Sequence, residues 1–388
     1  MSLSSTPALR QIASTSVFTA KTASSKAHLH KPIPDDLFPR GYVLGGVHSG
    51  VKKNPSALDL AVLLSTSSQP TAAAATFTRN AFQAAPVVVS KDVLKQTAGR
   101  ARGLVVNSGC ANAVTGKQGL ADAWAMARAT SALLPPYSSP SSATETETLV
   151  MSTGVIGQPL PISKILTALS ARSTLAQTLG SGFSAWDAAA RAFMTTDTFP
   201  KLRARSLSFG DGRTCRIAGI DKGAGMIHPD MGGLPHATLL GCIATDAPVA
   251  PGALQAALEY AVQRSFNAIS VDGDMSTNDT VVLFANGAAE GAAAKGVMID
   301  EARDPAAFVR FREGLTEFMQ ELAQLVVRDG EGATKFVTIS VEVRVWAAKS
   351  ESPHPLKFVC PGCFVVRRRT QNRVEDLNIC AGQDGALR

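Results

Sequence analysis

Short apolar runs that alternate with alanine-rich amphipathic stretches restrict the fold of this 388-residue chain more than any other feature. Residues 215–220 and 280–285 are rich in apolar and β-branched side chains and end at turn-forming residues, which is typical of strands. Residues 253–264 and 305–328 repeat apolar side chains at helical spacing. The alternation predicts a layered α/β fold, in which helices cover the faces of sheets. The same criteria predict further strands at 104–106, 149–151 and 238–244, and further helices at 120–134, 162–174 and 184–194.

Composition supports a sizeable core. Hydrophobic residues make up 45% of the chain and charged residues 18%, in the range of ordinary globular proteins. The sequence has no apolar run as long as the roughly 18 residues that a membrane-spanning helix needs, so no membrane association is predicted.

The net charge of +7 comes from the two ends of the chain. Residues 1–34 carry four basic and no acidic side chains, and residues 342–388 carry eight basic and five acidic ones. The intervening body holds 26 of each sign and is neutral. A nucleic-acid-binding protein would show a clustered basic face with interleaved aromatics, and aromatics are only 6% of the chain. Nucleic acid is therefore not an expected partner.

The first 34 residues are rich in Ser, Thr and Ala and contain no acidic residue before Asp35. They lack the continuous apolar core of a secretory signal, and their composition is typical of an organellar transit peptide. We therefore predict a mitochondrial transit peptide at 1–34 and a location in the mitochondrial matrix. The alternative is a disordered N-terminus that carries no address.

The cysteines do not form a metal set. Cys110, Cys215 and Cys242 lie in patterned segments and are predicted to be reduced, partly buried thiols. Cys360 and Cys363 form a CxxC, but with Cys380 they make three ligands rather than the four of a structural zinc site.

A group of carboxylates, Asp272, Asp274 and Asp279, has the acidic character of a cation site. Its spacing lacks the calcium-loop pattern and the glutamate that ends that pattern. A polar turn fixed by side-chain hydrogen bonds is the better interpretation, and no metal is predicted.

A glycine-containing segment, residues 222–227, precedes Ala237 and Thr238 at the start of a predicted strand. The glycines lack the spacing of a phosphate-binding loop. Taken alone, Thr238 is a β-branched strand residue, Lys222 a solvated surface lysine and Glu331 a carboxylate at a helix end.

Residues 39–342 nevertheless resemble the ornithine acetyltransferase/glutamate N-acetyltransferase family of the cyclic arginine pathway. The matching segments are separated along the chain and follow the family's order. They are 39–42, 45–47, 50–52, 77–80, 84–86, 107–112, 152–157, 195–201, 222–227, 245–247, 265–267, 271–274, 276–279 and 329–335.

The resemblance implies a precursor that cuts itself between Ala237 and Thr238. It implies an α chain of residues 35–237 and a β chain whose N-terminal part is 238–342. The new N-terminal threonine would be the nucleophile, and its own α-amine, with a pKa of about 8, would be the base. The expected fold is the layered α/β fold of this family, with an N-terminal nucleophile.

The resemblance also implies a ping-pong reaction and the residues that carry it. Thr238 takes the acetyl group of N-acetylornithine and passes it to glutamate, with no cofactor. By resemblance, the oxyanion hole is formed by Thr153 and Gly154, and the substrate is bound by Thr195 or Thr196, Lys222, Thr238 and Glu331. The family precedent implies an αβ heterodimer that assembles further, and leaves open whether acetyl-CoA also serves as acetyl donor.

The chain departs from the family pattern in two places. Residues 232–236 are an apparent insertion just before the scissile bond, and residues 343–388 diverge from the family's C-terminal portion. These departures keep two alternatives open. One is a truncated, inactive isoform, and the other is an amidase or aminopeptidase that passes the acyl group to water.

Overall fold

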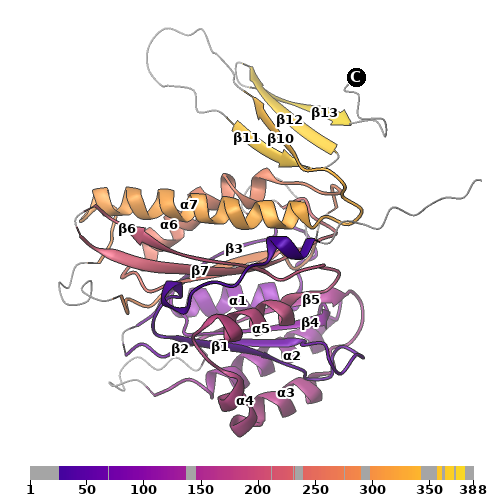
Figure 1. Cartoon of the computed structure of the whole chain (residues 1–388). Coiled ribbons are helices and arrows are strands. Elements are labelled where there is room, and N and C mark those ends of the chain that lie inside the picture. The colour runs from indigo at the N-terminus through magenta and orange to yellow at the C-terminus, as the bar shows by residue number, and fades with distance from the viewer. Residues whose placement is uncertain are drawn as a thin grey trace, which may run out of the picture.

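The computed structural model describes residues 26–68, 70–136, 146–210, 212–229, 231, 239–274, 276–289 and 298–341, and strands at 356–360, 363–370 and 373–380. The predicted cleavage residues Ala237 and Thr238, the insertion 232–236 and residues 1–25 of the predicted leader lie outside these ranges. The body is built in four layers, with two sheets packed between two sets of helices (Figure 1). The predicted layered α/β class is confirmed.

The two sheets combine strands that are far apart in the sequence. The first, four-stranded sheet has the order β1 (Tyr42–Val47), β2 (Leu60–Ser65), β4 (Gly103–Cys110), β5 (Thr148–Val155). The second, five-stranded sheet has the order β3 (Ala72–Phe77), β9 (Thr280–Ala285), β8 (Leu240–Thr245), β7 (Thr214–Lys222), β6 (Lys201–Ser208). In the first sheet, β4 and β5 are parallel and the other neighbours are antiparallel. In the second sheet, β8 and β9 are parallel and the others are antiparallel.

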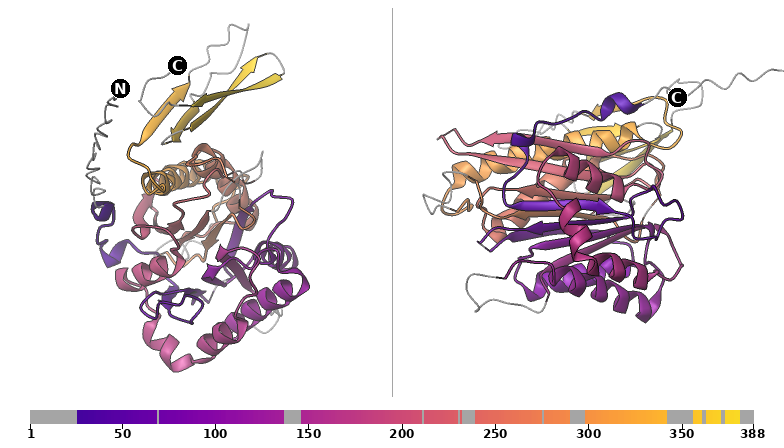
Figure 2. Two further views of the ribbon diagram at one scale, coloured as in Figure 1. Left: turned by 90° about the vertical axis from the view of Figure 1, so that its right-hand side faces the viewer. Right: turned by 60° about the horizontal axis from the view of Figure 1, so that its bottom comes forward.

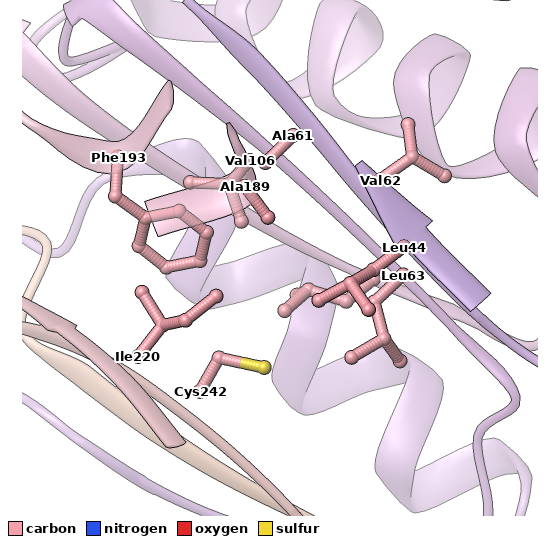
Figure 3. A pocket seen from close by; sticks show the side chains of 10 residues that line it. Leu44, Ala61, Val62, Leu63, Val106, Ala189, Phe193, Ile220 and Cys242 are labelled. Atoms are coloured by element: carbon pink, nitrogen blue, oxygen red, sulfur yellow. The ribbon is translucent and has the colours of Figure 1, made fainter. Parts of the chain in front are cut away.

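The period-two alternation of the strands divides their side chains between two cores. On β9, Val282 and Phe284 face the first sheet, whereas Val281 and Leu283 belong to the core on the helix side. Figure 3 shows the contact between the sheets, where Ile220 and Cys242 lie opposite side chains of the first sheet and of α5 (Phe183–Phe193). A space of only about 10 Å³ remains there, so the sheets are closely packed.

Helices cover the outer faces of both sheets. The outer face of the five-stranded sheet packs against α6 (Pro251–Gln263) and α7 (Pro305–Arg328), and α7 is seen end-on in the left view of Figure 2. On the four-stranded sheet, α1 (Ala85–Gln96) and α2 (Gly116–Ser131) lie side by side. The segment that connects β5 of the first sheet to β6 of the second forms α3 (Ile162–Ser170), α4 (Arg172–Thr178) and α5 (Phe183–Phe193).

Most predicted elements are found, and two differ. The helix predicted at 162–174 is divided at Ala171, whose ψ of 64° is not helical. Ser170, Ser173 and Thr174 surround this break, and their side chains compete with the helix for backbone hydrogen bonds. The strand predicted at 238–244 starts at Leu240 in the described chain.

Residues beyond the body form two small antiparallel pairs, where the sequence pattern predicts no element. One pairs β10 (Val337–Val341) with β11 (Leu356–Cys360), and the other pairs β12 (Cys363–Thr370) with β13 (Arg373–Cys380). In Figure 1 these strands lie beyond α7, on the side away from the sheets. Among the described helices, none has the length and apolarity needed to cross a membrane.

The three cysteines of the body are free and buried, as predicted. Burial raises the pKa of Cys215 and of Cys242 to about 12, so both are neutral packing groups.

Candidate active site

Thr153 and Gly154 lie near the carboxyl end of β5, beside the end of the parallel strand β4. Gly154 has a φ of 126°, which a residue with a side chain rarely adopts. A Cβ at this position would lie 2.3 Å from the carbonyl carbon of Gly109, so the two backbones are in direct contact. The family resemblance places the oxyanion hole at this irregular end of the strand, and only glycine fits there.

Replacing Gly154 by alanine should destabilise the fold by at least about 3 kcal/mol, because the strained φ and the overlap with β4 add together. Gly157→Ala is a matched control. Gly157 also has a positive φ, of 79°, but nothing lies within 4 Å of its added Cβ, so a loss of only about 1 kcal/mol is expected. Urea unfolding of the two variants measures the difference, and equal losses would show that the contact with β4 is unimportant.

Lys222 is the last residue of β7 and is 3% exposed, so it is not the surface lysine that its sequence suggests. Its Nζ donates a hydrogen bond to Thr153 Oγ1 at 3.3 Å. Burial lowers the pKa of Lys222 below its usual value, and Asp197 partly offsets the effect. The contact joins the two sheets and brings together two predicted site residues that are 69 positions apart.

Thr195 and Thr196 lie in the exposed connection between α5 and β6. The buried carboxylate of Asp197 accepts a hydrogen bond from Thr195 N at 3.0 Å and another from Gly223 N at 2.8 Å. Burial alone would raise the pKa of Asp197, but Lys201 and Lys222 hold it far below its usual range. The Asp197 carboxylate therefore holds this connection beside Lys222. No local sequence pattern singles out Asp197 for this role.

Glu331 reaches the site from the end of α7. Its backbone N donates to Ala224 O at 2.7 Å. Its carboxylate lies over Gly225, where an added Cβ would be 2.6 Å from Glu331 Oε1. Because Gly225 has no side chain, the Glu331 carboxylate fits against the segment that follows Lys222.

The predicted nucleophile, Thr238, is joined by its peptide bond to Leu239, which is described and fully buried. Leu239 N donates to Asp279 Oδ1 at 2.5 Å, and Leu239 O accepts from Thr280 N at 3.0 Å. The next residue, Leu240, is the register partner of Lys222. The start of β8, which follows Thr238 in the sequence, therefore lies at the same end of the sheet as Lys222.

Asp279 is buried, and its Oδ2 has no hydrogen-bond partner among the described residues. Burial raises its pKa well above the usual range, and two backbone hydrogen bonds and Lys222 offset this only in part. The sequence pattern predicts that Asp279 lies in a polar turn with Asp272 and Asp274. The structure separates it from Asp272, which accepts hydrogen bonds from Met226 N at 2.6 Å and Ile227 N at 2.8 Å.

The polar-turn interpretation is confirmed for Asp272, which also accepts from the backbone N of Asp274 at 3.2 Å. Within the described ranges, no group of three or more His, Cys, Asp or Glu side chains is placed to hold a metal ion. The charged groups around the site are instead arranged as ion pairs and hydrogen bonds.

Comparison with known proteins identifies a family for this chain. A sequence model of the ArgJ family matches residues 43–352. The mitochondrial arginine biosynthesis bifunctional protein ArgJ of Postia placenta is 63% identical over 346 residues, which cover 87% of this chain and 72% of that protein. Its counterpart in Coprinopsis cinerea is 60% identical over 342 residues, covering 86% and 70%. The ornithine acetyltransferase of Mycobacterium tuberculosis, solved with ornithine, is 36% identical with a TM-score of 0.41, covering 50% of this chain and 94% of that one.

Proposed function

Because the chain belongs to the ArgJ family, we propose that it transfers the acetyl group of N2-acetyl-L-ornithine to L-glutamate in arginine biosynthesis, through an acetyl ester on Thr238. One observation carries the assignment of the site. Lys222 contacts Thr153 across the two sheets, at the end of β7 where β8 begins. The predicted oxyanion residue, the predicted carboxylate-binding residue and the strand that follows Thr238 thus lie together.

Each group has a definite task in the transfer. Thr238 Oγ attacks the acetyl carbonyl carbon while its proton passes to the α-amine of the same residue. Thr153 and Gly154 stabilise the oxyanion, to which a single donor typically contributes about 3 kcal/mol. The amide C–N bond then breaks, and the α-ammonium returns the proton to the leaving nitrogen of ornithine. The neutral amine of glutamate next attacks the ester carbon, and Thr238 Oγ leaves and regains a proton.

Lys222 and Glu331 suit the two charged ends of ornithine. The ammonium of Lys222 pairs with the α-carboxylate of the substrate, and the Glu331 carboxylate pairs with its side-chain ammonium. Lys222 Nζ makes one hydrogen bond to a described residue, at the long distance of 3.3 Å, so its other protons can be donated to a substrate. Thr195 or Thr196 would add a hydroxyl from the adjacent connection.

The same hydroxyl would also cleave the peptide bond before Thr238 and so free the α-amine of that residue. Thr238 Oγ attacks the carbonyl of Ala237, the acyl group moves from nitrogen to oxygen, and water hydrolyses the ester. This gives the α chain 35–237 and a β chain that begins at Thr238. We further propose that the two remain together as a heterodimer that assembles further, and that the reaction uses neither a metal nor a cofactor. Acetyl-CoA would be a second acetyl donor for glutamate.

The relatives are named as mitochondrial proteins, which supports a mitochondrial location for this chain. The composition of residues 1–34 points in the same direction, with basic and hydroxylated side chains and no acid. We propose the matrix as the compartment in which the protein acts.

The function is tested by incubating the purified protein with N2-acetylornithine and glutamate and following ornithine and N-acetylglutamate. Intact-mass analysis of the same sample should show a fragment that begins at Thr238. Equal amounts of ornithine and N-acetylglutamate support transfer. Free acetate in place of N-acetylglutamate would show an amidase instead. A single uncut chain without activity would identify an inactive form and overturn the proposal.

A further inference from the structure

Lys201, the first residue of β6, is a fully buried lysine outside the set of predicted site residues. Its Nζ lies 2.6 Å from Asp197 Oδ1 and 2.6 Å from Asp329 Oδ2. Burial would lower the pKa of Lys201, but the two carboxylates raise it above its usual value, so the lysine is charged. The three side chains form a buried carboxylate–ammonium–carboxylate bridge.

Each carboxylate of this bridge holds a different segment of the site. Asp197 accepts from Thr195 N at 3.0 Å and from Gly223 N at 2.8 Å, which fixes the residue that follows Lys222. Asp329 accepts from Thr198 N at 2.9 Å and from the Thr198 hydroxyl. Asp329 is also the C-cap of α7 and stands two residues before Glu331. One ammonium therefore connects the segments that carry both ends of the substrate site.

Stability alone is a weak reason for such a bridge, because a buried ion pair is often no more stable than apolar side chains of the same volume. The bridge also has one more carboxylate than ammonium. Lys26 Nζ lies 3.8 Å from Asp329, and Lys222 interacts electrostatically with Asp197. Lys26 and Lys222 thus offset the excess negative charge, and the bridge is coupled electrostatically to the site through Lys222.

We propose that Lys201 is a positioning residue that fixes the separation between Lys222 and Glu331, and thereby selects the length of the amino-acid substrate. This inference rests on the proposed function of the site. A substrate with an α-carboxylate and a distal ammonium fits only when its two charges match that separation. Ornithine and lysine differ by one methylene group. The ratio of the kcat/KM values for N2-acetylornithine and N2-acetyllysine as acetyl donors therefore measures how firmly the separation between Lys222 and Glu331 is held.

Two variants test the role of the bridge. Asp329→Asn keeps the shape and the pair between Lys201 and Asp197, but it removes one charge. The double variant Lys201→Met/Asp329→Asn removes one charge of each sign, so the total charge is unchanged while the bridge is lost. Glu147→Gln is a matched control. It alters the buried ion pair between Glu147 and Arg102, which are 2.7 Å apart just before the starts of β5 and β4 and outside the site.

The double variant should lower kcat/KM for N2-acetylornithine by about tenfold to a hundredfold, mainly through KM, because displacement of a binding group by about 1 Å has effects of this size. The preference for N2-acetylornithine over N2-acetyllysine should fall by about tenfold or more. Asp329→Asn should change both values in the same direction and by less, and Glu147→Gln should change neither.

Hydrogen exchange and ornithine binding, measured by calorimetry, provide readouts that do not depend on transfer. The amides of Thr195, Thr198 and Gly223 should exchange faster in the double variant, and ornithine should bind about tenfold or more weakly. If the wild-type protein transfers no acetyl group, the proposed function fails, and these two measurements still decide the role of Lys201. Unchanged donor preference and unchanged ornithine affinity in Asp329→Asn and in the folded double variant would overturn the inference. If the double variant does not fold, Asp329→Asn alone decides it.

Discussion

A chain with alanine at position 238 should remain a single polypeptide and should transfer no acetyl group. Alanine lacks the hydroxyl that attacks the carbonyl of Ala237 in self-cleavage and the acetyl carbonyl in transfer. Loss of the nucleophile from a covalent mechanism commonly lowers kcat by a factor on the order of 10⁴ or more. Both effects have one origin, so mass spectrometry and the transfer assay should lose their signals together.

Two further variants test whether the losses of self-cleavage and of acetyl transfer are both due to the Thr238 hydroxyl. Thr238→Ser retains a hydroxyl and should still give cut protein with measurable transfer. Thr316→Ala removes a hydroxyl that only bonds to Arg312 O within α7, and it should behave as the wild type. A cut Thr238→Ala chain would assign the cleavage to another group. An uncut but fully active one would remove Thr238 from the mechanism.

The parts of the fold that depend on local chemistry could be predicted from the sequence. Pro305 stands at the first helical position of α7, and the Asp304 side chain caps Ala307 N, so the start of that helix follows from nearby residues. β9 coincides with its prediction because its turn residues and β-branched side chains lie next to each other. The break at Ala171 was missed because the apolar periodicity continues across it.

Partners that are far apart in the sequence could not be predicted in this way. The burial of Lys222 depends on a strand of the other sheet, 69 positions away, and local sequence gives only the default of a solvated lysine. Asp329 and Lys201 are 128 positions apart, so their ion pair leaves no local pattern. Site residues such as Glu331 were predicted from the family resemblance. The carboxylates that hold the segments of these residues in place became visible only in the structure. Asp197 and Asp329 lie within the family-like segments 195–201 and 329–335, so their charge inside these segments was the signal that could have identified them.

Replacing Lys222 by methionine should weaken the binding of both amino-acid substrates, because it removes the buried positive charge that we assign to their α-carboxylates. Removing one partner of a buried, hydrogen-bonded charge pair costs about 2–5 kcal/mol, so kcat/KM should fall by about thirtyfold or more. Methionine has a similar length and no charge, so the packing between the sheets is largely kept. Lys95→Met, on the exposed side of α1, is the matched control and should have no effect.

The pH dependence of ornithine binding distinguishes a direct role of Lys222 from a packing role. The ammonium form of Lys222 binds a carboxylate, and burial places its pKa below the usual lysine value of 10.5. Affinity should therefore be complete near neutral pH and should decline as the pH rises through this lowered pKa, before an ordinary lysine would titrate. Catalysis has the opposite pH dependence, because it needs a neutral α-amine on Thr238 and this form increases as the pH rises. Calorimetric titration with ornithine measures binding alone and avoids this effect. In Lys222→Met the alkaline decline due to this group should vanish and the affinity should be low throughout. Unchanged affinity together with an unchanged decline in that variant would mean that Lys222 does not bind the carboxylate, and that its contact with Thr153 serves only to join the two sheets.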